Sequence, residues 1–370
     1  HGTHFTVEAY ASRLLETLRT VGMLPPEGKR APRRKAPAPD RYEKTQPLAA
    51  DLKPDDLVIL GPQDEACGVG QYGRQVAAVM EGHYVSYMTE GLTQGSLLLQ
   101  YHPFYMNNPH ISMYLKRLCG KHRVILDIHH PDRLWELPHA AAAIYHSHAF
   151  DSEVHKFFPQ AKYMPLMTPE MPDGGTEIVA AKAGILIGWH GLWMPHKGVD
   201  LLIRAVRLLR KEGVDCGLVA IGGIHDIDEP SRHRSLGYWD SCRDAAGDMG
   251  EAVGLSNLTA SYSSVRATLE SCQVMCLPYI TLEEGQSSAL AVMLAFGKPV
   301  AVTKVPMFAD LMQWCFPLPE PPLTERQLAE ALRPLLTQAG LREQYAQCAK
   351  LAHDEARPET MVELYREAMG

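Results

Sequence analysis

The sequence has no apolar run of the roughly 18 residues that a membrane-spanning helix needs, so no segment is predicted to cross a bilayer. It also has no excess of positive charge, because 36 Lys and Arg residues stand against 43 Asp and Glu residues, a formal net charge of −7. Proteins that coat nucleic acids need basic surfaces to neutralise phosphates, so no nucleic-acid partner is expected. The first ten residues lack a basic stretch followed by an apolar one, which favours a cytoplasmic location over secretion.

Paired cysteines are missing as well. The eight cysteines form no CxxC pair, and no Cys or His spacing resembles a zinc site. We therefore expect reduced, mostly buried thiols, with no bound metal and no cofactor.

A length of 370 residues suggests two domains, preceded by a segment of different composition. Residues 7–22 have helical apolar spacing, and residues 24–54 hold seven of the 27 prolines, which predicts an extended linker. The basic cluster at 29–35 has two readings: contact with an anionic membrane surface or an acidic partner, and a solvated, disordered stretch. The second reading is favoured.

From residue 57, short apolar runs alternate with longer helical stretches, the pattern of βα units and a parallel sheet. A segment rich in Pro, Asp and Gly at 168–177 separates two sets of such runs. The predicted strands of the first set are 56–60, 83–88, 96–101, 123–128, 141–146 and 161–166. Those of the second set are 184–189, 216–223, 258–263, 273–279 and 299–304, with helices at about 198–212, 240–253, 286–297 and 324–338.

These elements predict an α/β protein with two Rossmann-like, doubly wound domains that face each other across a cleft. The expected boundaries are 1–54 for the appendage, 55–175 and 180–340 for the two domains, and 341–370 for a helical tail that packs back across both. Ligands bind outside the carboxyl ends of the strands in such sheets, so the strand-end loops are the candidate site.

The first of these loops, 61–80, carries Gly68, Gly70 and Gly73 in the G-x-G-x-x-G spacing of a dinucleotide-binding turn. Glycines let the backbone approach a ligand closely, and a helix start attracts anions. A tight turn without a ligand explains the same spacing about equally well.

The second loop places His129 and His130 just past an apolar strand. A histidine there can hydrogen-bond a polar ligand or transfer a proton, and a helix-capping or loop role is the alternative. We favour function for one of the two. A metal site is not expected, because no further Asp, Glu or His has matching spacing.

The third loop brings Lys197 to the start of an amphipathic helix, where a cation adds to the favourable dipole for a diphosphate. The alternative is an ordinary surface lysine, although positive charge at a helix start is slightly unfavourable.

The fourth loop, in 278–305, leads through TLEEGQSS into a helix. Glu283 or Glu284 can accept hydrogen bonds from sugar hydroxyls, or act only as helix-start charges. The backbone N–H groups that can cradle a phosphate are those of Gln286, Ser287 and Ser288.

This fourth loop, together with GLWMPHKGVDLLIRA (191–205) and the glycine-bearing loop, resembles the retaining nucleotide-sugar glycosyltransferases of the GT-B fold, in particular the GT4-like (group 1) family. The resemblance covers about 55–345 and is more specific in the C-terminal half. It implies two Rossmann-like domains with the donor held mainly by the second.

The resemblance also implies roles for single residues. Glu284 matches the first glutamate of the family's E-x7-E motif, Lys197 the lysine that grips the donor diphosphate, and His129 the histidine that approaches the transferred sugar. The implied catalytic residues are thus His129, Glu284 and Lys197, and the implied donor-binding residues are Gly68, Gly70, Lys197, Glu284, Gly285, Gln286, Ser287 and Ser288. His130 and Glu283 are the candidates for contacts to the acceptor or sugar.

Two positions depart from the family pattern. The second glutamate of E-x7-E falls on Val292, and the usual arginine falls on Leu192 or Gly191. We expect Gln286, Ser287 and Ser288 to substitute in binding the phosphates, and His190 or an arginine of 232–234 to supply charge.

The resemblance implies metal-independent transfer of a sugar from a UDP- or GDP-sugar, with retention of configuration, to a glycan, lipid-linked sugar or small molecule. Two alternatives stay open. A nucleotide-sugar 2-epimerase would need acid and base carboxylates in the cleft, for which Asp64, Glu65 and Asp132 are the main candidates. A non-catalytic scaffold that binds nucleotide sugars would explain Val292 and Leu192.

Overall fold

The computed structural model describes residues 52–62, 68–87, 89, 91–225, 229–280 and 287–369. The basic cluster at 29–35 lies outside these ranges, as do Asp64 and Glu65. So do four of the predicted site residues, Glu283, Glu284, Gly285 and Gln286.

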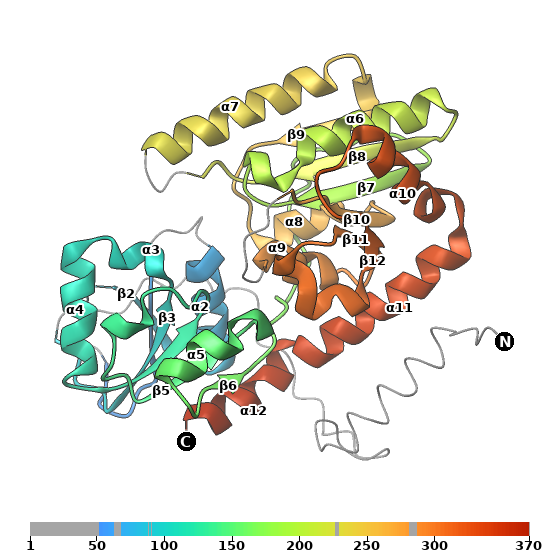
Figure 1. Cartoon of the computed structure of the whole chain (residues 1–370). Helices are drawn as coiled ribbons and strands as arrows, with labels where there is room; N and C mark the ends of the chain where they lie inside the picture. Colours follow the sequence, from blue (N-terminus) through green and yellow to red (C-terminus); the bar gives the residue numbers. More distant parts are fainter. Residues whose placement is uncertain are drawn as a thin grey trace, which may run out of the picture. The chain divides into compact units, whose positions relative to one another are not determined.

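The first half of the described chain forms a six-stranded parallel sheet in the order β2-β1-β3-β4-β5-β6 (Figure 1). Its inner strands are nearly continuous apolar runs, as expected for a parallel sheet covered on both faces. The strands are β1 (Val58–Gly61), β2 (His83–Ser86), β3 (Ser96–Tyr101), β4 (Arg123–Ile128), β5 (Ala142–Tyr145) and β6 (Lys162–Tyr163). The helices are α2 (Gly68–Val79), α3 (Pro103–Met106), α4 (Pro109–Cys119) and α5 (Asp151–Phe157), with 3-10 turns η3 (Leu134–Glu136) and η4 (His148–Phe150).

The second half forms another six-stranded parallel sheet, in the order β12-β11-β10-β7-β8-β9. Its strands are β7 (Ile185–His190), β8 (Cys216–Ile221), β9 (Val253–Ser256), β10 (Val274–Leu277), β11 (Val300–Thr303) and β12 (Phe316–Leu318). The helices are α6 (Val199–Lys211), α7 (Glu229–Ala246), α8 (Tyr262–Leu269), α9 (Ser288–Leu294), α10 (Glu325–Thr337), α11 (Ala339–Ala356) and α12 (Pro358–Met369). The 3-10 segments are η5 (Pro195–Lys197), η6 (Gly250–Ala252) and η7 (Pro306–Trp314). The predicted fold class, α/β with two Rossmann-like sheets, is confirmed.

Three elements of the second half differ from the sequence-based prediction. The strand expected at 258–263 is wrong, because β9 lies earlier, at Val253–Ser256. Ser261 instead caps α8, its side chain accepting a hydrogen bond from the Ser264 N–H. Helix α7 begins well before the predicted 240, and β12 was not predicted.

The order of strands creates a switch point in each sheet, because chain progression reverses between β1 and β3 and between β7 and β10. Such points are where doubly wound sheets bind ligands. The two C-terminal helices pack on different halves: α11 contacts α9 and β11, whereas α12 contacts α2 and β5.

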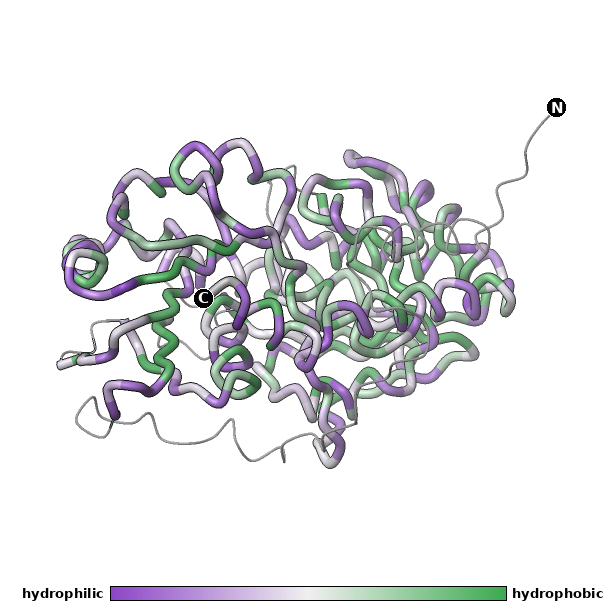
Figure 2. Tube along the Cα trace, turned by 90° about the horizontal axis from the view of Figure 1, so that it is seen from below, coloured by the Kyte–Doolittle hydropathy of each residue, from purple (hydrophilic) through white to green (hydrophobic). Residues whose placement is uncertain are grey.

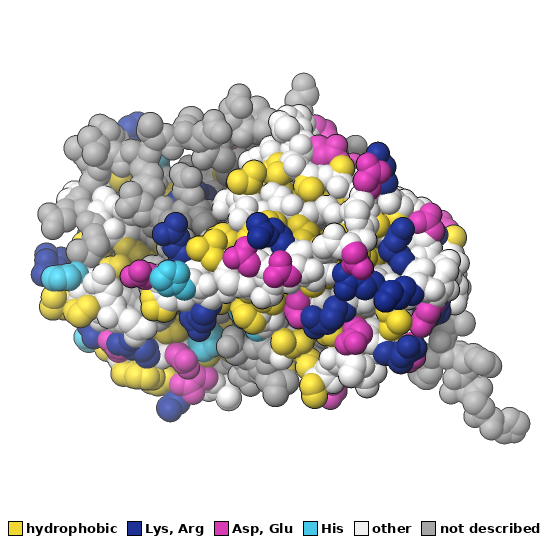
Figure 3. Space-filling view, turned by 90° about the horizontal axis from the view of Figure 1, so that it is seen from above, with side chains coloured by type: hydrophobic (Ala, Val, Ile, Leu, Met, Phe, Trp, Pro, Cys, Tyr) yellow, Lys and Arg dark blue, Asp and Glu magenta, His cyan; other side chains and the backbone are white. Residues whose placement is uncertain are grey.

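The distribution of side chains is that of an ordinary globular protein. Along the trace in Figure 2, hydrophobic and hydrophilic residues alternate over the outer helices, whereas the inner segments are mainly hydrophobic. On the face in Figure 3, basic and acidic side chains are interspersed instead of gathered by sign. Among the described helices, none combines the length and the apolar character needed to cross a bilayer.

Gly198, at the start of α6, shows how closely the elements of the second half approach each other. Its φ is +68°, and a Cβ built there would lie 2.1 Å from the Pro278 carbonyl oxygen. The site therefore needs glycine both for its left-handed backbone and for the close approach of a strand-end carbonyl.

We predict that Gly198→Ala lowers the free energy of unfolding by at least about 3 kcal/mol, from backbone strain and a backbone clash together. Gly213→Ala is the matched control, because its φ is +85° with no atom within 4 Å of the added Cβ. It should cost only about 1–2 kcal/mol. Urea unfolding measures both, and equal costs would contradict the role assigned to the Pro278 contact.

Candidate functional site

A pocket of about 180 Å³ opens at the carboxyl ends of the second sheet, beside the β7/β10 switch point. Most of its wall follows β7, β8 and β10, and the start of α2 completes it. The lining residues are Gly68, Gln71, His190, Gly191, Leu192, Lys197, Gly223, Thr259, Ala260, Tyr262, Tyr279, Ser287, Ser288, Ala289, Val292 and Met307. Gly68, Lys197, Ser287 and Ser288 are thus brought together, whereas Gly70 does not line the pocket.

Lys197 is held at the pocket wall by an aromatic ring. Its Nζ lies 3.9 Å from the centroid of the Tyr279 ring, a cation–π contact. The neighbouring His196 has a pKa of about 4, and burial is the main reason. The positive charges of Lys197, His225 and Arg234 lower this pKa further. The field next to Lys197 is therefore positive, which suits an anionic ligand.

The two serines have different tasks. Ser287 is buried and caps α9, its Oγ accepting a hydrogen bond from the Leu290 N–H, and it also lies 3.2 Å from the Tyr279 hydroxyl. Ser288 is exposed, and a Cβ built on Gly68 would lie 2.9 Å from its Oγ. Ser288, at the first position of α9, therefore faces the first residue of α2 and is the serine free to contact a ligand.

The glycines of the G-x-G-x-x-G spacing lie within the first turns of α2. Gly73 allows α2 to pack on the sheet, because a Cβ there would approach Gln100 Cγ and Tyr84 Cε2 to 2.7 Å. Gly68 lines the pocket, and Gly73 allows close packing of the helix on the strands, as glycines do in dinucleotide-binding folds.

Both departures from the family pattern lie in the pocket wall. Leu192 and Val292 line it, and Val292 is almost fully buried. His190 is also in the wall, but burial lowers its pKa to about 4 and it donates through Nδ1 to the Ile221 carbonyl. His190 is consequently neutral near pH 7 and cannot supply the missing positive charge, whereas Arg234 does contribute to the positive field.

Sequence reasoning missed four polar lining residues, Gln71, Thr259, Tyr262 and Tyr279. Gln71 stands inside the glycine motif, so its place at a helix start was a usable signal. Thr259 and Tyr262 were hidden by the reading of 258–263 as a strand.

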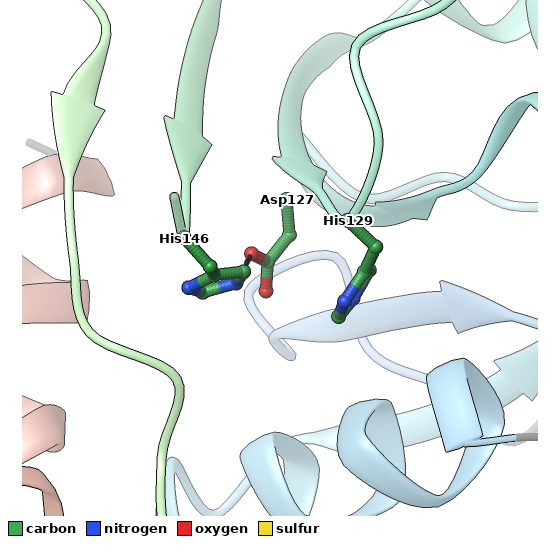
Figure 4. A group of neighbouring side chains, drawn as sticks. All are labelled: Asp127, His129 and His146. Carbon is green, nitrogen blue, oxygen red and sulfur yellow. Dashed lines mark hydrogen bonds and ion pairs between the residues drawn. The ribbon is translucent and has the colours of Figure 1, made fainter. Parts of the chain in front are cut away.

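His129 lies at the end of β4 in a cluster of polar side chains inside the first half (Figure 4). Its Nε2 is 2.8 Å from Gln100 Oε1, and its ring meets the Tyr72 ring edge-on at 5.1 Å. Burial, together with the positive charge of His146, keeps the pKa of His129 low, at about 3. His129 is therefore a neutral imidazole near pH 7.

Asp127, His129 and His146 are the described residues whose arrangement suggests a metal site, with potential ligand atoms all within 4.8 Å of one another. The two oxygens of Asp127 are however already engaged: Oδ1 lies 2.6 Å from His146 Nε2, and Oδ2 accepts from Gln100 and Tyr365. A bound ion would have to break these buried hydrogen bonds. The donor set fits a hydrogen-bonded network better than a metal centre.

His130 is not part of this network and instead forms a hydrogen bond within its own loop. Its Nδ1 accepts a hydrogen bond from the Asp132 N–H at 3.3 Å, and its ring lies near those of His102 and Phe150. Of the two adjacent histidines, His129 is the one that is hydrogen-bonded to Gln100, a partner of Asp127.

Comparisons with known proteins agree with this geometry. Residues 184–338 match the family model described as glycosyl transferases group 1. Sucrose-phosphate synthase from Thermosynechococcus elongatus is 13% identical, with 85% of this chain and 98% of that chain covered and a TM-score of 0.58. Anabaena HepE in complex with UDP and glucose is 10% identical, with the same coverages and a TM-score of 0.61.

The fold is that of the GT-B glycosyltransferases. The GT-B likeness extends to an α,α-trehalose-phosphate synthase from Burkholderia xenovorans in complex with glucose-6-phosphate, at 12% identity, 74% and 72% coverage and a TM-score of 0.55. No curated protein sequence matches the chain significantly. The resemblance stated from the sequence is confirmed by the family model and by the GT-B fold.

The buried histidines make the stability of the protein depend on pH. The pKa of His129 is about 3 and those of His102 and His190 about 4, below the ordinary 6.5, chiefly because of burial. Between pH 6.5 and 4 the unfolded chain takes up protons that the folded chain does not, so stability must fall as the pH is lowered.

We predict that the free energy of unfolding decreases steadily from pH 6.5 to pH 4. Urea unfolding at intervals of half a pH unit measures the slope. His190→Gln should make the slope shallower by up to one proton's contribution, whereas a flat profile in the wild type would contradict the assignment of neutral buried histidines.

Proposed function

We propose that the protein is a glycosyltransferase that moves a sugar from a nucleoside diphosphate sugar to a hydroxyl acceptor with retention of configuration. The observation that carries the proposal is the pocket at the β7/β10 switch point. Most of its lining residues belong to the segment matched by the family model, and it combines Lys197 and Ser288 with the start of α2.

The donor diphosphate is proposed to bind between Lys197 and the first turn of α2. Lys197 offers a positive charge at the pocket wall, and the free N–H groups of a helix start favour an anion. The hydroxyl of Ser288 and the side chain of Gln71 lie in the same wall and can donate to phosphate oxygens.

A front-face reaction fits these groups. The bond from the anomeric carbon to the diphosphate oxygen breaks, and its electron pair stays with that oxygen. The acceptor hydroxyl attacks from the same face, and its proton passes to the departing diphosphate. The protein then acts mainly by stabilising the charge that develops on the leaving group, with Lys197 and the start of α2 as the stabilising groups.

The ligands bound in two structural relatives support the choice of ligands to test. HepE was solved with UDP and glucose, and a trehalose-phosphate synthase, described as UDP-forming, with glucose-6-phosphate. We therefore propose a UDP-hexose as the first donor to test and a sugar or sugar phosphate as the first acceptor.

The pocket wall argues against the epimerase alternative. That reaction needs acid and base carboxylates at the sugar, yet none of the described residues that line the pocket is Asp or Glu. Asp132 is largely exposed and lies beside His130, and Asp127 is buried with its oxygens already hydrogen-bonded.

We predict that Lys197→Ala lowers kcat/KM for sugar transfer at least tenfold, about 1.4 kcal/mol of lost transition-state stabilisation. The assay measures nucleotide release and glycoside formation with UDP-, GDP- and dTDP-sugars. Lys211→Ala, an exposed lysine in the last turn of α6, is the control and should leave the rate unchanged.

Near-normal transfer by Lys197→Ala would remove this lysine from the site. Tight binding of a nucleotide sugar without turnover, whatever the acceptor, would favour the scaffold alternative instead. Isothermal titration with the same panel of donors distinguishes these outcomes.

A further inference from the structure

Asp127, on β4, is fully buried and accepts hydrogen bonds from three side chains. His146 Nε2 lies 2.6 Å from Oδ1, and Oδ2 accepts from Gln100 Nε2 at 3.0 Å and from the Tyr365 hydroxyl at 2.7 Å. The three partners come from β3, from the end of β5 and from the C-terminal helix α12.

The hydrogen-bonding capacity of these groups sets their protonation. His146 Nδ1 lies 3.0 Å from the Met164 carbonyl, which can only accept, so Nδ1 carries a proton. Its Nε2 faces a carboxylate. Burial by itself raises the pKa of Asp127, but the adjoining His146 charge and hydrogen bonds bring it below the ordinary value, so Asp127 is ionised. His146 and Asp127 are therefore joined by a short, buried hydrogen bond.

An ionised Asp127 determines how the Gln100 amide is oriented. Only the amide NH₂ can pair with a carboxylate, so the amide oxygen must point to the other side, where His129 Nε2 lies at 2.8 Å. A carbonyl oxygen cannot donate, and hence Nε2 of His129 must carry the ring proton. The remaining nitrogen, Nδ1, then has a free lone pair and makes no hydrogen bond to any described residue.

Neighbouring groups keep this arrangement in place. Gly73 allows α2 to lie against the Gln100 side chain, and the Tyr72 ring packs edge-on against His129. Tyr72 also hydrogen-bonds the Tyr365 hydroxyl at 2.9 Å. Since Tyr365 gives its proton to Asp127, Tyr72 must be the donor in that pair. Tyr72 directly follows Gln71, which lines the pocket.

We propose that Asp127, acting through Gln100, is a positioning residue that holds His129 in the Nε2–H tautomer, so that its Nδ1 lone pair is presented as a hydrogen-bond acceptor. A neutral acceptor of this kind takes an O–H group and gives nothing to a phosphate oxygen. The tautomer does not rest on the proposed function.

The tautomer can be measured directly on the full chain labelled with ¹⁵N-histidine. Long-range ¹H–¹⁵N correlation spectra separate protonated from unprotonated ring nitrogens, and His129→Gln identifies the signals of His129 among the 17 histidines. At pH 7 we expect a protonated Nε2 and an unprotonated Nδ1. The opposite tautomer, or a doubly protonated ring, would overturn the proposal.

Variants of Asp127 and Gln100 test the cause of the tautomer. In Asp127→Asn the new NH₂ group should donate to His146 Nε2, because His146 Nδ1 is engaged by the Met164 carbonyl, and the amide oxygen still accepts from Gln100, so the Nε2–H tautomer should be retained. In Asp127→Ala the Gln100 NH₂ group loses its acceptor, so the tautomer preference should be lost. In Gln100→Leu the preference should be lost, with both tautomers present. Gln94→Leu removes a buried glutamine outside the network and should leave His129 as in the wild type.

A purely structural role for Asp127 would leave the His129 tautomer unchanged in a folded Asp127→Ala variant. If Asp127→Ala does not fold, Gln100→Leu and the wild-type spectrum still decide the question. An unchanged His129 tautomer in a folded Gln100→Leu variant would overturn the proposal that Asp127 acts on His129 through Gln100.

Discussion

The buried hydrogen bond between Asp127 and His146 is the interaction on which the first half of the molecule depends. Polar side chains inside a sheet are tolerated only when their lone pairs and protons are satisfied, because a buried polar group left without its partner costs about 1–3 kcal/mol, and more if it is charged. Here the Gln100 amide, the Tyr365 hydroxyl and the Met164 carbonyl complete the set. The same bonds that stabilise the pair therefore orient a histidine and anchor the C-terminal helix.

In the second half, positive charge lies at the carboxyl ends of the strands, and none of the described residues that line the pocket there is a carboxylate. Lys197 lies on the Tyr279 ring, and Gly198 lets the following helix start pass directly over the Pro278 carbonyl. The charge of Arg234 adds to the positive field near Lys197, and it is one of the charges that lower the pKa of His196. Leu192 and Val292 make part of that wall apolar, and Thr259, Tyr262 and Gln71 add polar side chains to it.

Much of the architecture could be predicted, because buried parallel strands are short continuous apolar runs and read clearly in RVILDI and CGLVAI. The prediction failed at 258–263, where Thr259 and Tyr262 have strand propensity but Ser261 is a helix cap. The true strand, VGLS, is only four residues long and contains a glycine, a residue that is depleted in strands. Lys197, Ser287 and Ser288 could be placed at the site because each stands next to a helix start, a local signal.

The sequence by itself determined most of the strands and the positions of their strand-end loops, since these follow from local pattern and from the geometry of parallel sheets. Only the tertiary structure decided that Tyr365 reaches Asp127, 238 residues away along the chain, and that Gln100 stands between Asp127 and His129. No local periodicity relates residues so distant. The protonation of His129 follows from those contacts and is therefore a property of the folded protein.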